Sequence, residues 1–231
     1  GSHDGATWRL GKRAFLDGAG IDTQPQAKAA EMLEDQGATV VWLARDKALV
    51  GLLAIADPIK PDSAEALTRF RALGLKLVMI TGDSARTAAA VGEQVGVDEV
   101  IAEVMPADKS AKVAELQAAG QIVAMVGDGI NDAPALKQAN VGIAIGTGTD
   151  IAIEAADVTL ISGSLTGVVK AIKLSRATFR KIMQNLFWAF FYNVIAVPLA
   201  VLGLLHPTIA EIAMAFSSIN VVGNSLRLKN V

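Results

Sequence analysis

The stretch that decides the fold, residues 122–136, reads I-V-A-M-V-G-D-G-I-N-D-A-P-A-L. Its five leading apolar residues predict a strand buried on both faces. Asp128 and Asp132 follow, and Gly127 and Gly129 flank the first, where they permit backbone conformations and close approaches that a side chain would block. The segment D-A-P then predicts a helix start, with an acidic cap and a proline in the first turn. Two carboxylates therefore gather at the carboxyl end of a strand, where open α/β sheets bind ligands.

Carboxylate oxygens at such a place suit a hard cation, most simply Mg²⁺ beside a phosphoryl group. The alternative is a solvated turn rich in Gly, Asn and Asp, but the full string directly after a strand favours the functional reading. The string resembles the Mg²⁺-binding loop of the P-type ATPases, within the wider haloacid-dehalogenase fold. The resemblance implies an aspartyl-phosphate enzyme that uses ATP and Mg²⁺ to pump ions, with Gly127, Gly129 and Asn131 in its phosphoryl and Mg²⁺ loop.

Composition sets broad limits on the class of protein. The chain has 231 residues, of which 52% are hydrophobic, and a formal net charge of −2. A near-neutral chain gives no indication of a nucleic-acid surface, so no nucleic-acid partner is expected. The absence of cysteine excludes a disulfide or a thiolate metal site within these residues.

Residues 1–55 form a first segment that is too small to be a free-standing domain. By resemblance it is the carboxy-terminal part of an α+β nucleotide-binding domain. Gly11, with Lys12, could approach a nucleotide, although an ordinary strand end is the alternative. Asp46-Lys47 is expected to be a hairpin turn, since it lacks the rest of the D-K-T-G-T phosphorylation motif. The patterns predict strands at 6–10, 39–43 and 49–55 and a helix at 27–36 that ends at Gly37.

Residues 56–164 alternate strands and helices, which predicts an α/β domain with a parallel sheet and helices on both faces. The resemblance identifies it as a haloacid-dehalogenase-like (Rossmann-type) phosphorylation domain that lacks its first strand and its nucleophile. The motif D-P-I-K-P at 57–61 marks the boundary, and Asp62-Ser63 is expected to cap a helix with Ala64, Leu67, Phe70 and Leu73 on one face. The patterns predict strands at 75–80, 100–104, 122–126, 141–145 and 158–161, and further helices at 84–95, 107–119 and 150–156.

Thr81, Gly82 and Asp83 follow one predicted strand, so the Thr81 hydroxyl is expected at the same sheet edge as Asp128. The resemblance assigns Thr81 to a phosphoryl oxygen and Lys109 to charge neutralisation beside it, as phosphoryl transfer requires. For Lys109 the alternative is a solvated helix lysine. Asp83 is expected to stabilise the loop or cleft rather than to perform chemistry.

Residues 165–231 change character. Residues 165–184 predict an amphipathic linker helix, and residues 186–205 and 209–226 predict two transmembrane helices separated by a turn at His206-Pro207. Basic residues flank both ends of this hairpin and none lies at its tip, which places both ends and the catalytic domains in the cytoplasm. Buried core helices of a soluble protein are the alternative.

Polar residues within the two predicted spans indicate an ion path or, alternatively, helix packing. Met214, Ser217 and Ser218 share one helix face. With Asn185 and the pair Tyr192-Asn193, they resemble the N-x6-Y-N and M-x-x-S-S motifs of the copper(I)-transporting P-type ATPases. The thioether of Met214 is a soft ligand that suits Cu(I), although Ag(I) is left open. The resemblance assigns the transported ion to Tyr192, Asn193, Met214, Ser217 and Ser218.

The resemblance also defines what these residues do not contain: the phosphorylated Asp of D-K-T-G-T, the T-G-E loop and the Cys-Pro-Cys helix. We therefore expect a carboxy-terminal fragment of a Cu(I)-exporting ATPase, inactive by itself and completed by the amino-terminal part of the same pump. The expected setting is the lipid of a bacterial plasma membrane, with copper delivered by a metallochaperone. A soluble haloacid-dehalogenase-type phosphatase and a non-enzymatic truncated membrane regulator are the alternatives.

Overall fold

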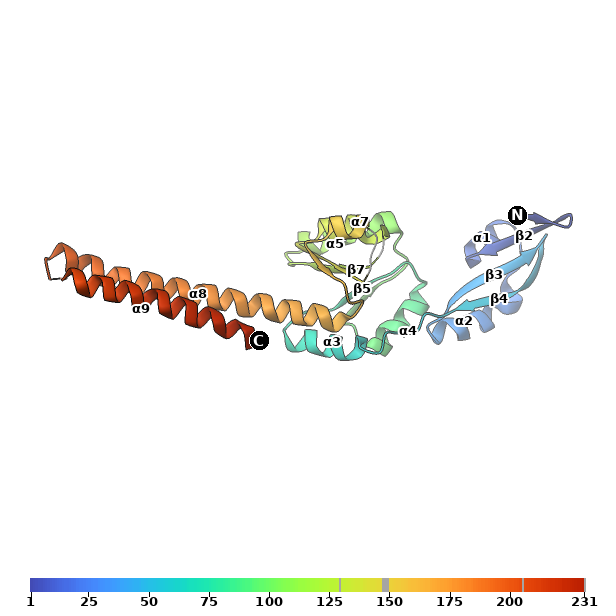
Figure 1. Cartoon of the computed structure of the whole chain (residues 1–231). Helices are drawn as coiled ribbons and strands as arrows, with labels where there is room; N and C mark the ends of the chain where they lie inside the picture. Colours follow the sequence, from blue (N-terminus) through green and yellow to red (C-terminus); the bar gives the residue numbers. More distant parts are fainter. Residues whose placement is uncertain (129, 147–149, 205, 231) are drawn as a thin grey trace. The chain divides into compact units, whose positions relative to one another are not determined.

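The computed structural model describes residues 1–128, 130–146, 150–204 and 206–230. The chain divides into two compact units, Gly1–Gly167 and Val168–Val231 (Figure 1). The first unit holds the mixed α and β structure, and the second consists of helices.

The first 55 residues fold around a four-stranded antiparallel sheet in the order β1-β2-β3-β4. Trp42 is only 2% exposed and packs with Leu16 and Ile21 in a small core, which explains why an apolar β3 pairs centrally. The predicted strands, helix and hairpin turn are confirmed, whereas the sequence patterns missed β1 and α1. The elements are β1 (Ser2–His3), β2 (Ala6–Gly11), α1 (Arg13–Gly18), α2 (Ala27–Asp35), β3 (Thr39–Arg45) and β4 (Ala48–Ile55).

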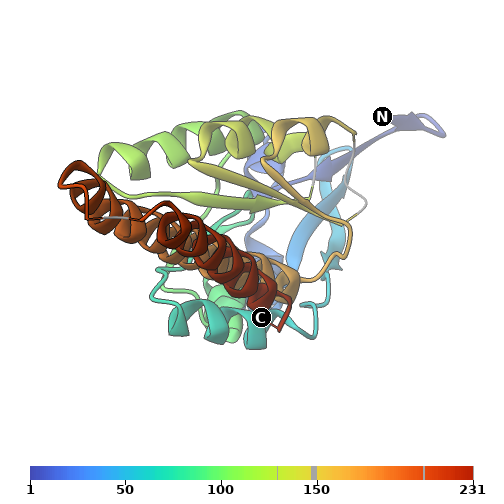
Figure 2. The same ribbon diagram turned by 60° about the vertical axis from the view of Figure 1, so that its left-hand side comes forward.

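Residues 56–164 form parallel strands with helices on two sides. Figures 1 and 2 show α5 and α7 on one side of the strands and α3 and α4 on the other, as predicted. The helices are α3 (Ser63–Ala72), α4 (Ala85–Val95), α5 (Lys109–Ala118), α6 (Ala133–Gln138) and α7 (Asp150–Ala155). The strands are β5 (Val78–Ile80), β6 (Glu99–Ile101), β7 (Ala124–Gly127), β8 (Val141–Ile145) and β9 (Val158–Leu160).

The parallel strands form two separate ladders rather than the single sheet that the alternating pattern predicts. One ladder pairs β5 with β6, and the other has the order β7-β8-β9. Among the described residues, no strand pairs with the second edge of β5 or of β7. The unpaired edges of β5 and β7 therefore have backbone groups that are available to a further strand.

Several local expectations were wrong. The strand predicted at 122–126 begins only at Ala124 and is not buried on both faces, because Ile122 is 89% exposed, Ala124 is exposed, and Met125 and Val126 are half-buried. The Val123 amide donates to the Asn140 side chain (2.9 Å) and not to a strand. Ala64 is exposed, since the buried face of α3 is formed by Ser63, Ala66 and Phe70. The Asp62 side chain makes no capping hydrogen bond to α3.

Asp62 instead joins two segments that are a hundred residues apart in sequence. Its Oδ2 accepts from the Ser164 hydroxyl (2.5 Å) and from the Thr166 amide (3.2 Å), and Lys60 Nζ donates to the Gly163 carbonyl (2.9 Å). The Ser164 hydrogen bond, followed by that of Thr166, lowers the pKa of Asp62 below its ordinary value. We call these contacts the 60–166 clasp, and they fix the first turn of the following helix, α8.

Two helices, α8 (Leu165–Val201) and α9 (Pro207–Leu226), make up the carboxy-terminal region. The predicted linker helix and first span are one continuous helix, and Pro198 lies within it. Within the described residues, only α8 is long and apolar enough to cross a membrane by length and composition, with a mean hydropathy of 1.4 in its most apolar window. The second span at 209–226 coincides with a helix but stays a prediction as a membrane span.

Candidate functional site

Lys109 and Asp132, which were predicted separately, form an ion pair. Lys109 begins α5, Asp132 immediately precedes α6, and Lys109 Nζ lies 2.7 Å from Asp132 Oδ1. Both side chains are largely buried, with exposed fractions of 19% and 13%. The expected acidic cap is absent, because the Asp132 side chain makes no capping bond to α6 and is paired with the lysine instead.

Gly127 is packed closely against the Asp132 side chain. A Cβ atom at Gly127 would come within 2.7 Å of Asp132 Cβ and 2.9 Å of Asp132 Oδ2, so the loop tolerates only glycine there. Gly127 ends β7 and is buried, whereas Asp128 and Asn131 are exposed. Gly129 lies outside the described residues.

A magnesium ion was predicted at this loop from its carboxylates. Within the described residues, no three His, Cys, Asp or Glu side chains gather as a metal site. Two carboxylates, one of them packed so closely on Gly127 that a Cβ there would collide with it, are nevertheless a donor set that fits Mg²⁺. Mg²⁺ commonly uses one or two carboxylates and completes its shell with water and phosphate oxygens.

The Thr81-Gly82-Asp83 segment forms a compact bend after β5. Thr81 Oγ1 donates to Asp83 Oδ2 (2.7 Å), and the Asp83 amide is 3.2 Å from Thr81 Oγ1. A Cβ at Gly82 would lie 3.2 Å from the Val104 carbonyl, so the bend packs closely against the residues after β6. Thr81 and Asp132 both follow carboxyl ends of parallel strands. Asp83 makes hydrogen bonds within the bend, and its role in stabilising the loop or cleft stays a prediction.

Two residues of the first segment hold this bend, and the sequence patterns predicted neither contact. Thr39 Oγ1 donates to Asp83 Oδ1 (2.8 Å), and Lys12 Nζ donates to the Gly82 carbonyl (3.0 Å). No local pattern could reveal Thr39, which is 44 residues from Asp83. Gly11 lies against the exposed Phe15 ring, where a Cβ would come within 2.9 Å of Cδ1, and its contact with a nucleotide stays a prediction.

The predicted ion ligands lie on α8 and α9. Tyr192 OH is 3.2 Å from Asn220 Nδ2 across the two helices, whereas Asn193 Nδ2 donates to the Ala189 carbonyl of its own helix (2.8 Å). Met214 is 72% exposed, Ser218 is exposed and Ser217 is half-buried. The two helices therefore bring Tyr192 into a polar contact, while the other predicted ligands are not joined to one another by hydrogen bonds among the described residues.

The polar contacts between the helices extend further than was predicted. Asn224 Nδ2 donates to Asn185 Oδ1 (2.8 Å), and its Oδ1 accepts from Lys181 Nζ (2.8 Å). Asn185 also donates to Ser225 Oγ (2.9 Å). Asn220 and Asn224 were overlooked, although polar residues within an apolar span are the signal that identified Ser217.

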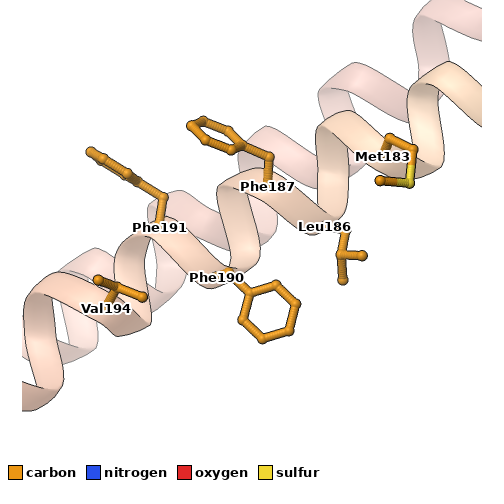
Figure 3. Close-up of a pocket in the computed structure, with 6 residues that line it drawn as sticks. All are labelled: Met183, Leu186, Phe187, Phe190, Phe191 and Val194. Carbon is orange, nitrogen blue, oxygen red and sulfur yellow. The ribbon is translucent and has the colours of Figure 1, made fainter.

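An apolar hollow on the outer surface of α8 is separate from these polar residues. Figure 3 shows its lining, which comes from α8 alone: Met183, Leu186, Phe187, Phe190, Phe191 and Val194. Phe187 and Phe191 stack, with ring centroids 5.8 Å apart. Apart from the Met183 thioether, this lining offers no metal-binding atom, so the hollow does not correspond to the predicted ion site.

Comparison with known families gives a consistent result. Two family profiles described as haloacid dehalogenase-like hydrolase match residues 3–140 and 110–172. A probable copper-exporting P-type ATPase V of Mycobacterium tuberculosis is 60% identical over 203 residues, which are 88% of this chain and 26% of the relative. The probable copper-transporting ATPase PacS of Synechococcus elongatus is 53% identical over 236 residues, which are 99% of this chain and 32% of the relative.

A solved structure agrees with the sequence matches. The crystal structure of a zinc-transporting PIB-type ATPase in the E2.Pi state matches with a TM-score of 0.77 and 36% identity over 98% of this chain and 36% of that chain. The chain thus spans about a quarter to a third of the length of the curated relatives described here. The resemblance to the P-type ATPases is confirmed, and the chain belongs to the haloacid dehalogenase-like hydrolase family.

Proposed function

We propose that these residues serve as the carboxy-terminal part of an ATP-driven Cu(I) export pump, in which aspartyl-phosphate formation and hydrolysis drive metal translocation across a membrane. The observation that carries the proposal is that a haloacid dehalogenase-like domain continues into an apolar helix of membrane-spanning length, α8. A soluble phosphatase does not account for that helix, and a non-enzymatic regulator does not account for the Lys109–Asp132 pair above Gly127.

In this proposal each residue of the α/β part has a distinct task. Mg²⁺, held by Asp128 and Asp132, supplies charge neutralisation for phosphoryl transfer when it is bound. Lys109 adds a positive charge beside the phosphoryl oxygens. It also holds Asp132 in place, since its ammonium group lies 2.7 Å from the Asp132 carboxylate. The Thr81 hydroxyl, at the carboxyl end of β5, contacts a phosphoryl oxygen.

The nucleophilic Asp and its strand come from the amino-terminal part of the pump. The open edges of β5 and β7 support this assignment, because each presents unpaired backbone groups that one further parallel strand would satisfy. ATP is the phosphoryl donor, and the first 55 residues complete the nucleotide-binding domain.

For the transported ion we propose Tyr192, Asn193, Met214, Ser217 and Ser218, with cysteines of the absent part completing the site. Support comes from the relatives, whose names describe copper transport, and from the soft thioether of Met214. The setting is a bacterial plasma membrane with the α/β parts in the cytoplasm, and a metallochaperone supplies the copper.

The test uses a chimera, called here the restored pump, in which this chain replaces the matching 236-residue region of the Synechococcus elongatus relative. Copper should stimulate its ATPase activity and its acid-stable phosphorylation from ATP, and Asp128→Ala or Asp132→Ala should slow phosphorylation by orders of magnitude. The proposal fails if the folded restored pump forms no phosphoenzyme, or if zinc stimulates it and copper does not.

A pair of matched variants tests the copper site. Met214→Leu keeps the side-chain volume and removes the sulfur, whereas Met183→Leu makes the same change in the apolar hollow of α8. Copper stoichiometry should fall in the first variant and stay unchanged in the second, while phosphorylation from inorganic phosphate survives in both. Unchanged copper stoichiometry and affinity in Met214→Leu would make Met214 a packing residue.

A further inference from the structure

The bend at residues 81–83 is held by a relay of hydroxyl and carboxylate groups. Asp83 accepts two hydrogen bonds on different oxygens, from Thr81 at Oδ2 (2.7 Å) and from Thr39 at Oδ1 (2.8 Å). The hydroxyl groups of Thr81 and Thr39 are the donors, so both hydroxyl protons point to Asp83. Thr39 is the first residue of β3, and the relay therefore links the first segment to the Thr81 hydroxyl.

The surroundings of Thr39 are fixed by a second buried contact. Thr87, which is 2% exposed, donates from Oγ1 to the carbonyl of Ala38 (3.0 Å), the residue before Thr39. Lys12 Nζ donates to the Gly82 carbonyl (3.0 Å) from the same segment. The first segment is thus joined at three points to the bend and the start of α4.

Charged groups continue this interface on the surface. The guanidinium of Arg86 lies 2.9 Å from Asp35 and within 4.0 Å of Glu31 and Glu34, all in the second half of α2. The hydrogen bond and charge of Asp35 raise the pKa of Arg86 above its ordinary value. The acidic end of α2 is therefore matched to the start of α4, next to the bend.

We propose that Thr39 is a positioning residue for the Thr81 hydroxyl. By fixing one oxygen of Asp83, Thr39 selects the carboxylate orientation in which the other oxygen keeps the Thr81 oxygen in place. The Thr81 proton is directed to Asp83 in this structure, and it must turn to the phosphoryl oxygen when that group is bound. The position of the nucleotide-binding segment is in this way transmitted to a group that contacts the phosphoryl oxygen. The phosphoryl contact of Thr81 belongs to the proposed function, and the inference rests on it to that extent.

Three variants separate positioning from mere stabilisation of the interface. Thr39→Val removes the hydroxyl and keeps the shape, and Thr39→Ser keeps a hydroxyl. Thr87→Val removes the neighbouring bond to the Ala38 carbonyl and the 3.0 Å contact with Ser84 Oγ, neither of which involves the Asp83 side chain. The first readout is amide hydrogen exchange of the 231-residue chain in detergent, which needs no enzymatic activity. The Asp83 amide, whose acceptor is Thr81 Oγ1, should exchange faster in Thr39→Val and near the wild-type rate in Thr39→Ser.

The second readout is the rate of phosphoenzyme formation from ATP in the restored pump. Losing a hydrogen bond to a charged group should slow this step about tenfold in Thr39→Val. Thr39→Ser should restore most of the rate, and the folded fraction of Thr87→Val should react at the wild-type rate.

The outcomes distinguish the inference from the proposed function. A restored pump of wild-type sequence that is never phosphorylated overturns the function, and the exchange result then still decides whether Thr39 orders the bend. A phosphorylated restored pump in which Thr39→Val reacts as fast as wild type overturns the inference alone. The inference is also overturned if the Asp83 amide exchanges at an unchanged rate, or if Thr87→Val slows phosphorylation as much as Thr39→Val does.

Discussion

Replacing Gly127 by alanine should displace Asp132, because the added methyl group collides with that side chain. The added Cβ would meet Asp132 Cβ at 2.7 Å and its carboxylate oxygen at 2.9 Å. Because the Cβ of Asp132 is anchored to the backbone, rotating the aspartate cannot relieve the clash, and the start of α6 must shift. Such a shift also lengthens the 2.7 Å contact between Lys109 and Asp132.

The expected loss of stability has two parts. Overpacking of this kind typically costs about 1–3 kcal/mol. The ion pair is mostly buried, so its loss should cost more than the roughly 1 kcal/mol of an exposed pair and less than the roughly 3–5 kcal/mol of a fully buried one. Together they suggest that the free energy of unfolding falls by about 2–4 kcal/mol, allowing for partial relaxation.

The measurement is urea unfolding of the chain in detergent, followed by circular dichroism. Gly51→Ala is the matched control, since a Cβ at Gly51 in β4 has no heavy atom within 4 Å and should change stability little. The Gly127→Ala change should be measured again in an Asp132→Gly background, where the side chain that the added methyl group meets is gone. If Gly127→Ala is equally destabilising in both backgrounds, the clash with Asp132 is not the cause and the reasoning is refuted.

Three further changes test other parts of the structure. Trp42→Ala should lower the unfolding free energy by about 3–5 kcal/mol, measured by denaturant titration, because this 2%-exposed ring fills the core of the first segment. The hydrogen bond from the Leu77 amide, and then Arg71, lower the pKa of Asp98 below 3.8. The stability that Asp98 contributes is therefore present above that pH and is lost as the pH falls through the pKa of the folded state. An NMR titration should find the lowered pKa of Asp98 and a rise of that pKa in Arg71→Ala. Asn224→Ala should weaken the α8–α9 pair by about 1 kcal/mol in detergent unfolding, because the Asn185 amide oxygen and Lys181 both lose a partner.

Helices and strands could be predicted from the sequence where the residues that fix their ends are close to those ends in the sequence. The helix after Thr81-Gly82-Asp83 has Ser84 as its N-cap, accepting from the Thr87 amide, and Gly96 in the left-handed conformation at its end (φ 76°), so sequence patterns located both ends. The start of β7 was misplaced because the decisive bond, from the Val123 amide to the side chain of Asn140, crosses 17 residues.

Prediction of the candidate site fails for the same reason, because its contacts join residues that are distant in the sequence. The resemblance pointed to Lys109 and the strand-end pattern to Asp132, but their pairing depends on how α5 and α6 pack, which no spacing encodes. Thr39 carried no signal at all, because a threonine at the start of a strand is typical of strands in general. Residues that act through a partner in a distant segment become visible only when the segments are folded together.

The 60–166 clasp has a consequence for the order of folding. Its bonds join residues that are 102–104 positions apart. Closing a flexible loop of about a hundred residues costs about 4 kcal/mol of chain entropy, so such bonds cannot lead folding and form after the intervening strands and helices have shortened the path. The first turn of α8 is therefore among the last parts of the first unit to be fixed. A destabilising substitution in any of the strands β5 to β9 should therefore loosen the first turn of α8, even where the substituted residue lies far from Asp62 in the sequence.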